Sequence, residues 1–533
     1  MADRRRSSVF TVGALSCTTG IFLATIAGIF LCLPYVSLAD PSQLGAFGVL
    51  HALIIFMSRC LAASLPFGLA ALVAKYSSRN DWKTVTHIRL FASVALIAAA
   101  AVIAAILAFA ADPLSRFIFA GAPVSYIETL RSVFYIAAAL ILLFAVLYLF
   151  RGFWQGMNEM VIDTRSQLIE QIAYILAAGG ALAYIYFHQD SKNILLYLIF
   201  GACIFSVLLA IGYYVLFDKL KYPRIGSLAH NQLQLPVKKK KANSELFAFA
   251  TPGFLVVFIQ GLFLLTNIVF FIPLCQRNGM DANEAMKLFE AMTVNCAWLA
   301  EIPVLLAYLL SSGAIPEIIE GVETNNAMRI DRGVERILGR FIYAAAPFLF
   351  SVIMLAPQLY HIIYGDINAA ENAMMLSWTM AEGVAVAFGM ISSWMMISLR
   401  FHQNNVLYNA VGLIIKGLTM YFLMKYMGYA GAMASTIVAV LAVLFLCQSR
   451  ISNYYGVSYQ RLFLQTAKIA MACLCMNGVY ALFKYFGLDG LNASRLLSVG
   501  HVALMLAVAV PVYLFVTGMM KVNVQLFGHR NRS

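Results

Sequence analysis

Five ionisable side chains lie inside long apolar stretches of the sequence: Arg59, Glu170, Glu301, Glu382 and Lys416. On insertion scales, a charge at the centre of a membrane helix costs roughly 2.5–3.5 kcal/mol. Such residues therefore tend to face a polar cavity or to pair with one another. We take these five as the first candidates for chemistry.

The two bases, Arg59 and Lys416, could bind an anion. Arginine can hold a phosphate through two parallel hydrogen bonds, whereas lysine acts as a point charge. We expect Arg59 to contact a lipid diphosphate, and the alternative is a structural pair with an acid. Lys416 is expected either to make a second phosphate contact or to form an ion pair between two lobes that gates one side.

The three acids could bind a proton or a coupling cation. Glu301 stands two residues before Pro303, where the proline removes a helical hydrogen bond. Because burial favours the protonated carboxyl, Glu301 and Glu382 are candidates for ion coupling or gating, although either could simply neutralise a base such as Arg59. Glu170 begins the predicted helix over 166–187, so we expect an acid that stabilises a helix N-terminus, and a role in ion coupling or gating is the alternative.

Two amides add polar surface to the predicted helix over 246–273. Gln260 and Asn267 are seven residues apart, so they share one face of that helix. We expect a hydrogen-bonded pair inside a helix bundle, and the same amides are candidates for substrate binding.

The composition requires a lipid environment for these residues. Of 533 residues, 62% are hydrophobic and 11% are charged, whereas soluble domains have about 45–50% and about 25%. The sequence predicts an all-α integral membrane protein with about fourteen spanning helices. The apolar runs lie near 10–38, 44–74, 88–111, 129–150, 166–187, 194–217, 246–273, 290–312, 338–360, 373–399, 406–427, 429–448, 464–486 and 495–519.

The basic residues predict the orientation in the membrane. With the N-terminus inside, 27 of the 37 Lys and Arg residues fall in cytoplasmic segments, 8 in outer segments and 2 within the membrane. We therefore expect a multi-pass protein of the cell membrane with both termini in the cytoplasm. The net charge of +13 then reflects the anionic leaflet, and no nucleic-acid partner is expected.

The longest polar stretch divides the predicted helices into two groups. We expect an N-terminal lobe over 1–217, a basic cytoplasmic linker over 218–245 and a C-terminal lobe over 246–448. Residues 449–533 would add two further helices and a cytoplasmic tail.

The two lobes resemble each other weakly at similar offsets. Pro66 and Pro303 are 237 residues apart in similar apolar contexts, and Arg151 and Arg400 are 249 residues apart at helix ends. A near-constant shift predicts two six-helix repeats, which in many transporters enclose the substrate site at their interface.

The segment Arg151–Ile175 carries a more specific pattern, an Arg-Gly-aromatic-x-Gln-Gly turn followed by Ser-Gln-x-x-Glu-Gln. These residues are Arg151, Gly152, Phe153, Gln155, Gly156, Ser166, Gln167, Glu170 and Gln171. With the proline-containing stretches Ser64–Asp81 and Ala300–Gly321, they resemble the multidrug/oligosaccharidyl-lipid/polysaccharide flippase superfamily. The similar branch is that of lipid II flippases and stage V sporulation protein B.

The resemblance implies two six-helix lobes in a V-shaped arrangement plus two C-terminal helices, which could hold a prenyl tail. It implies a flippase that moves a polyprenyl-diphosphate-linked saccharide by alternating access. Arg151, Gln155, Pro66 and Pro303 would be structural motif residues. Because the run over 10–38 lacks charge and Asn267 occupies an acidic position of the family, lipid II and an exopolysaccharide or wall-polymer unit both remain open as the glycan.

Two other functions are weighed against this one. A cation-coupled multidrug or metabolite antiporter of the same superfamily would depend on the acids rather than on the bases. An enzyme is not expected, because the outer segments 112–128 and 274–289 are short and carry no acidic metal-binding motif. No Walker A motif occurs, so we expect no cofactor, and coupling to Na⁺, H⁺ or the membrane potential. The other expected partners are membrane lipids, and the expected state is a monomer.

Overall fold

The structure is a computed structural model, and the residues that it describes form helices joined by short turns. The described residues are 31, 34–233, 235–365, 369–488 and 494–527. Thirteen helical segments of this part are long and apolar enough to cross a bilayer. Each coincides with one of the thirteen predicted spans from 44–74 to 495–519, and the predicted span over 10–38 falls almost entirely outside the described residues.

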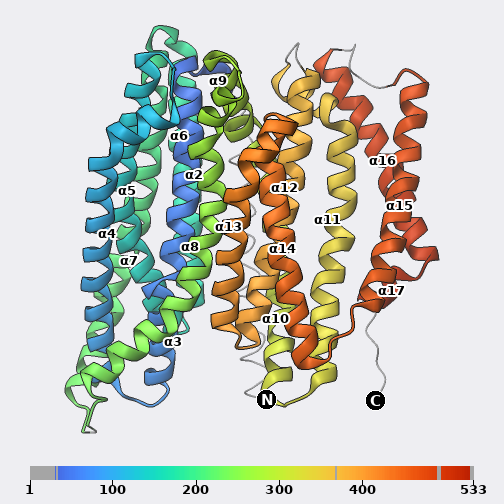
Figure 1. Ribbon diagram of the computed structural model, residues 1–533. Helices are drawn as coiled ribbons and strands as arrows, with labels where there is room; N and C mark the ends of the chain where they lie inside the picture. The colour runs from blue at the N-terminus through green and yellow to red at the C-terminus, as the bar shows by residue number, and fades with distance from the viewer. Residues whose placement is uncertain (1–30, 32–33, 234, 366–368, 489–493, 528–533) are drawn as a thin grey trace. The chain divides into compact units, whose positions relative to one another are not determined.

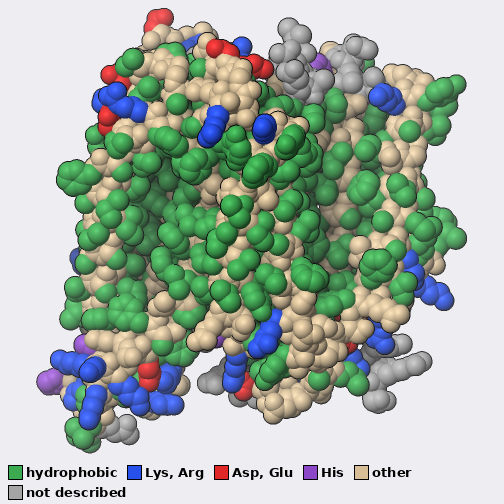
Figure 2. Space-filling view, in the orientation of Figure 1, with side chains coloured by type: hydrophobic (Ala, Val, Ile, Leu, Met, Phe, Trp, Pro, Cys, Tyr) green, Lys and Arg blue, Asp and Glu red, His purple; other side chains and the backbone are tan. Residues whose placement is uncertain are grey.

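The side chains on these helices are distributed as a bilayer requires. Large apolar residues point outward along the spans, and Phe109, Phe445 and Phe515 are 88%, 72% and 68% exposed. In Figure 2, hydrophobic side chains cover the middle of the helices, and Lys and Arg gather at their ends. Since lipid offers the backbone no hydrogen bonds, only self-satisfied helices suit such a sequence.

The contacts group the chain into two compact units, which we call the N-terminal unit, up to Val294, and the C-terminal unit, from Asn295. In the N-terminal unit α5 is central, because it packs against α2, α3, α4 and α7 (Figure 1). The elements of this unit are α2 Pro41–Ala63, α3 Leu65–Ser77, α4 Trp82–Ile118, α5 Val124–Gly156, α6 Met160–Phe187, the 3₁₀ helix η1 Gln189–Ile194, α7 Leu195–His230, α8 Lys239–Arg277 and α9 Ala282–Glu290.

The C-terminal unit is built around α12, which packs against α10, α11 and α14. A second apolar core forms where α15 and α16 pack against α11. A π-helical segment, η2 Ala291–Cys296, leads into this unit. Its helices are α10 Ala297–Glu323, α11 Ala327–Tyr364, α12 Ala369–Ser398, α13 His402–Met427, α14 Ala430–Tyr455, α15 Gln460–Tyr485, α16 Arg495–Met519 and α17 Val522–Phe527.

The boundary between the two compact units does not lie at the predicted linker. Helix α8, which we assigned to the C-terminal lobe, packs against α2, α3 and α4 of the N-terminal unit. Packing and sequence repetition are different properties, so the division into two six-helix repeats stays a prediction.

The predicted linker over 218–245 is mostly helical. Helix α7 continues to His230 and α8 begins at Lys239. At 1.5 Å per residue, the 36 residues of α7 extend about 54 Å, well beyond a hydrocarbon core of about 30 Å. Helix α7 therefore extends beyond the hydrocarbon, which the apolar pattern alone did not predict.

Asp81 joins the segment between α7 and α8 to the turn before α4. Its carboxylate caps α4 by accepting from the Thr84 backbone N–H at 3.2 Å, and it also accepts from Gln232 Nε2 at 3.0 Å and the Val237 N–H at 3.3 Å. Burial raises the pKa of Asp81, but the hydrogen bonds outweigh burial and hold the pKa below its usual range.

Candidate functional site

The span that carries Arg59 is broken at Ser64. Helix α2 ends at Ala63 and α3 begins at Leu65, and Pro66 stands in the first turn of α3, where its missing N–H is tolerated. The hydroxyl of Ser64 donates to the Leu61 carbonyl at 2.7 Å. The proline-containing segment predicted from the sequence is therefore a two-piece span.

Two glycines of the Arg-Gly-aromatic-x-Gln-Gly motif let α5 lie directly against α3. A Cβ on Gly152 would overlap the backbone carbonyl of Pro66, and a Cβ on Gly156 would overlap that of Ala70. Because no larger residue fits at either position, the glycines and Pro66 together fix the distance between the two helices.

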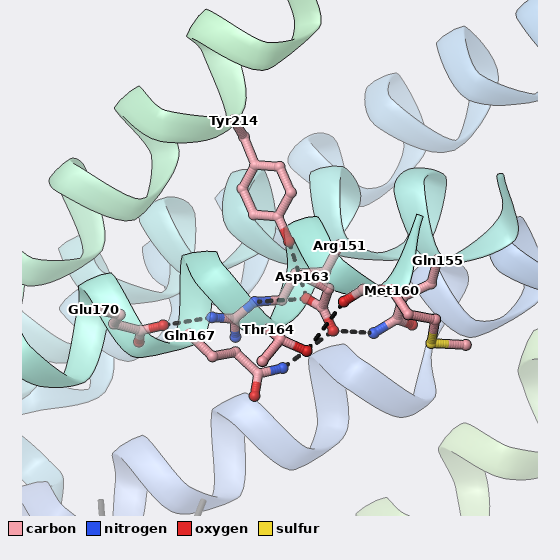
Figure 3. A network of polar contacts seen from close by, with 8 residues as sticks. All are labelled: Arg151, Gln155, Met160, Asp163, Thr164, Gln167, Glu170 and Tyr214. Carbon is pink, nitrogen blue, oxygen red and sulfur yellow. Dashed lines mark hydrogen bonds and ion pairs between the residues drawn. The ribbon is translucent and has the colours of Figure 1, made fainter. Parts of the chain in front are cut away.

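The polar residues of the same motif contact α6 and α7 (Figure 3). Asp163 of α6 is fully buried and accepts three hydrogen bonds, from Gln155 Nε2 at 2.8 Å, Gln167 Nε2 at 3.1 Å and Tyr214 Oη at 2.9 Å. We call this group, with Arg151 and Glu170, the Asp163 network. Buried polar groups of this kind are stable only when they are bonded, and this carboxylate is well satisfied.

Arg151 supplies the positive charge of the Asp163 network. Its guanidinium pairs with Glu170, its Nε lies 3.7 Å from Asp163 Oδ1, and it lies over the Tyr148 ring at 5.1 Å. Arg151 is only 8% exposed, so these partners replace water for a buried charge. The arrangement joins α5, α6 and α7.

The structure corrects our interpretation of Glu170 as a residue near a helix N-terminus. Helix α6 begins at Met160, so Glu170 lies ten residues into it, and the acid of the first turn is Asp163. The predicted span began at 166, and it therefore excluded the carboxylate that organises the network. The four-residue spacing of Arg151 and Gln155, which puts both on one helix face, is the pattern that could have indicated a buried acid opposite them.

Arg59 lies where α2 faces α8. A Cβ on Gly261 of α8 would overlap the Phe56 ring, and a Cβ on Gly253 would lie 3.5 Å from the Ala63 carbonyl, so the two helices run antiparallel. Arg59 falls between Phe56 and Ala63 on this contact stripe.

Gln260 and Asn267 follow Gly253 at seven-residue steps on α8, so they share the face that meets α2. Arg59 and Gln260 are half-buried, and Asn267 is buried. The structure thus brings Arg59 and Gln260 to the facing sides of one helix pair. No finding tests their role as substrate ligands, which stays a prediction.

Lys416 is fully buried in the C-terminal unit. From α13 its ammonium donates to the Thr436 hydroxyl on α14, and Glu382 of α12 acts on it electrostatically. Both contacts lie within the unit, and they make Lys416 part of an internal polar cluster in this conformation.

The two glutamates of the C-terminal unit stand beside a tight contact between α10 and α12. A Cβ on Gly383 would overlap the backbone carbonyl of Ala300. The neighbours of these residues in sequence are Glu382 and Glu301, both half-buried. Pro303 lies one turn further along α10. The structure therefore gathers Glu301, Glu382 and Lys416 within one unit, and it does not test their role in ion coupling.

Comparison with known proteins gives sequence relatives. No protein-family model matches the chain. The chain is 21% identical over 478 residues to the protein named lipid II flippase MurJ of Bacillus subtilis, a match that covers 88% of both chains. It is also 23% identical over 313 residues to stage V sporulation protein B of the same organism, which covers 57% of both chains.

Solved structures give the same fold. The chain matches the inward closed conformation of lipid II flippase MurJ with a TM-score of 0.66 and 12% identity, over 95% of this chain and 98% of that one. It matches an inward-facing MATE multidrug resistance transporter with a TM-score of 0.63 and 14% identity, over 84% and 99%. The chain is therefore similar in sequence to a lipid II flippase and to stage V sporulation protein B, and it has the fold of a lipid II flippase and of MATE transporters. The sequence similarity to the two Bacillus proteins confirms the resemblance to the branch of lipid II flippases and stage V sporulation protein B that the segment Arg151–Ile175 indicated.

The similarity to these proteins agrees with the thirteen candidate spans of the described residues, so the chain is a multi-pass membrane protein. The helical superfamily fold is likewise confirmed. Four residues of the Asp163 network belong to the motif identified in the sequence, whereas Arg59 and Lys416 were selected only by their charge. The four are Arg151, Gln155, Gln167 and Glu170.

Proposed function

We propose that this protein is a flippase for a polyprenyl-diphosphate-linked saccharide, either lipid II or the repeat unit of an exopolysaccharide or wall polymer. The observation that carries the proposal is the similarity to a lipid II flippase over 88% of both chains. Such a substrate needs a protein to cross the membrane, because a large polar headgroup cannot enter hydrocarbon without hydrogen-bonding partners.

Arg59 is the residue that we assign to the diphosphate. It is half-buried on the side of α2 that faces α8, and Gln260 lies on the opposing face. A guanidinium can bind a phosphate bidentately, and an amide can donate to a sugar or phosphate oxygen.

We assign Lys416 a gating role. Because the Lys416 ammonium donates to Thr436 and is under the electrostatic influence of Glu382 in this conformation, Lys416 would reach substrate only after α12, α13 and α14 rearrange. Alternating access would provide such a rearrangement, and Glu382 would then be free to take a proton or a cation.

The distribution of charge supports the orientation and the source of energy. The excess of Lys and Arg, 27 against 8, supports an orientation with both termini in the cytoplasm under the positive-inside rule. The membrane potential or a gradient of Na⁺ or H⁺, acting through Glu301 and Glu382, would drive the cycle.

A cation-coupled multidrug or metabolite antiporter is the second candidate. The fold match to a MATE transporter agrees with it. So does the enclosure of Lys416, because that leaves one fewer base for an anionic headgroup.

Reconstitution distinguishes the two candidates. Vesicles containing the protein and a labelled polyprenyl-diphosphate saccharide should expose the sugar to an external glycosidase faster than empty vesicles do. Arg59→Ala should slow this at least about tenfold, the effect of losing a charge-assisted contact, and Arg59→Lys should retain part of it. Arg131→Ala serves as the control, because Arg131 lies outside the Arg59 region, is half-buried as Arg59 is, and pairs with Asp112.

Flipping that survives Arg59→Ala unchanged would remove Arg59 from the mechanism. No flipping by the wild type, together with uptake of a cationic dye that Glu301→Gln or Glu382→Gln abolishes, would establish the antiporter instead.

A further inference from the structure

A long apolar groove runs between α6 and α7 on the exposed side of the N-terminal unit. It consists of two hollows of about 510 Å³ each, which share Ala177 and Phe205 and are therefore continuous. The remaining lining residues come from α6, η1 and α7: Ile169, Ile172, Ala173, Leu176, Ala181, Tyr184, Ile194, Tyr197, Leu198, Gly201, Ala202 and Leu209.

The groove has the dimensions of one acyl chain. Its small residues include Ala173, Ala177 and Gly201, and nothing lies within 4 Å of a Cβ built on Gly201. Exposed Leu176 and Phe205 flank it. From residue 169 to residue 184 the groove extends about 22 Å along α6, which exceeds one leaflet of a hydrocarbon core of about 30 Å.

Arg165 stands at one end of the groove. It is exposed on α6, one helical turn before Ile169 and on the same face. In the part of the chain that the structure describes, no carboxylate pairs with it.

The depth of Arg165 follows from a nearby ion pair. Lys221 of α7 pairs with Glu159 at 2.5 Å, and both side chains are exposed. Arg165 lies six residues further along the chain, about 9 Å deeper if the helical rise is used. Helical side chains lean toward the N-terminus, so the guanidinium reaches back toward the headgroup level while the groove continues into the hydrocarbon.

We propose that this surface binds an anionic phospholipid of the bilayer, with the headgroup phosphate on Arg165 and one acyl chain in the groove between α6 and α7. A guanidinium near the hydrocarbon boundary that no carboxylate of the described residues neutralises favours a phosphate that brings net negative charge. A zwitterionic lipid offers the same phosphate, but its own cation opposes Arg165. The site is separate from Arg59 and Lys416 and does not depend on the substrate proposed above.

Lipid binding to the full-length protein in detergent tests the proposal. Phosphatidylglycerol and phosphatidylcholine with identical chains would be titrated, and bound lipid would be counted by native mass spectrometry. We expect phosphatidylglycerol to bind more tightly. Arg165→Ala should weaken its binding about tenfold, and Arg165→Lys should weaken it less.

A matched pair of glycine variants tests the groove. Gly201→Leu adds a side chain to the groove and should reduce phosphatidylglycerol binding severalfold. Gly212 lies on the same helix and does not line the groove, and a Cβ built on it also meets open space. Gly212→Leu should therefore leave phosphatidylglycerol binding unchanged.

Free glycerol phosphate and undecaprenyl phosphate complete the test. Glycerol phosphate should bind far more weakly than the lipid, because it lacks the chain that fills the groove. Equal binding of both phospholipids, an unchanged affinity of Arg165→Ala, or tighter binding of undecaprenyl phosphate than of phosphatidylglycerol would each overturn the proposal.

Discussion

The two units use the same kind of backbone contact at related positions. In the N-terminal unit Gly152 of α5 lies against the Pro66 carbonyl of α3, and in the C-terminal unit Gly383 of α12 lies against the Ala300 carbonyl of α10. In each case a glycine of the central helix meets the helix that carries the membrane proline, Pro66 or Pro303. The offsets, 234 residues for the carbonyls and 231 for the glycines, are close to those of the sequence repeat.

The charge beside the contact is opposite in the two units. Arg151 precedes Gly152 and pairs with Glu170 on the next helix, whereas Glu382 precedes Gly383 and acts on Lys416 on the next helix. Close helix packing therefore restricts the residue at the contact to glycine, but it does not determine the sign of the charge on the residue before that glycine. Function can therefore differ between the halves of one architecture.

Among the substitutions that test this comparison, removal of Arg151 should cause the largest loss of stability. Arg151→Ala leaves Asp163 and Glu170 buried without their cation, so we expect a loss of about 3–5 kcal/mol in unfolding free energy. Thermal unfolding in detergent would measure it. Arg151→Ala combined with Glu170→Gln should recover part of the loss, and a stability equal to wild type in the single variant would contradict the structural role of the network.

Substitution of the two contact glycines should cause the next largest loss of stability. Gly152→Ala and Gly383→Ala each force helices apart, and overpacking of this kind costs about 1–3 kcal/mol. Similar losses in both variants would strengthen the correspondence of the two contacts. Gly212→Ala is the control because its Cβ meets open space, and a harmless Gly383→Ala would break the comparison.

The interaction energy between Lys416 and Glu382 should be measurable, but smaller than the loss expected for Arg151→Ala. A double-mutant cycle of Lys416→Met and Glu382→Gln should give an interaction energy of about 0.5–3 kcal/mol, with the double variant more stable than the sum of the two single losses implies. Additive losses would show that the C-terminal unit has no counterpart of the Arg151 pair.

We expect the smallest change in stability from substitution of Arg400, which the sequence offset related to Arg151. Arg400 pairs with Glu323, and the two side chains are 67% and 61% exposed. Exposed pairs contribute about 0–1 kcal/mol, so Arg400→Gln should shift the melting temperature little. A loss as large as that of Arg151→Ala would restore the sequence correspondence of these two arginines.

The spans could be predicted because lipid imposes one rule on every one of them. A helix in hydrocarbon needs a long apolar run, and the runs from 44–74 to 495–519 each became one. Outside the hydrocarbon the rule does not apply. This explains why the polar stretch 218–245 was taken for a linker although α7 and α8 fill most of it.

The polar partners could be predicted only in part. Charge in an apolar run identified Arg59, Lys416 and Glu382, but it gave no information on what each contacts. Asp163 was missed because it lay between two apolar runs, although α6 begins before it. A pairing such as Arg151 with Glu170 depends on how three helices pack, and a single sequence does not encode that in its spacing.

The carboxylate of Asp81 also holds the chain on both sides of the connection between α7 and α8. It accepts from Gln232 at 3.0 Å and from the Val237 N–H at 3.3 Å. An epitope inserted after Leu235 would therefore be anchored on both sides, so an antibody fragment bound there would serve as a fiducial for particle alignment in electron microscopy.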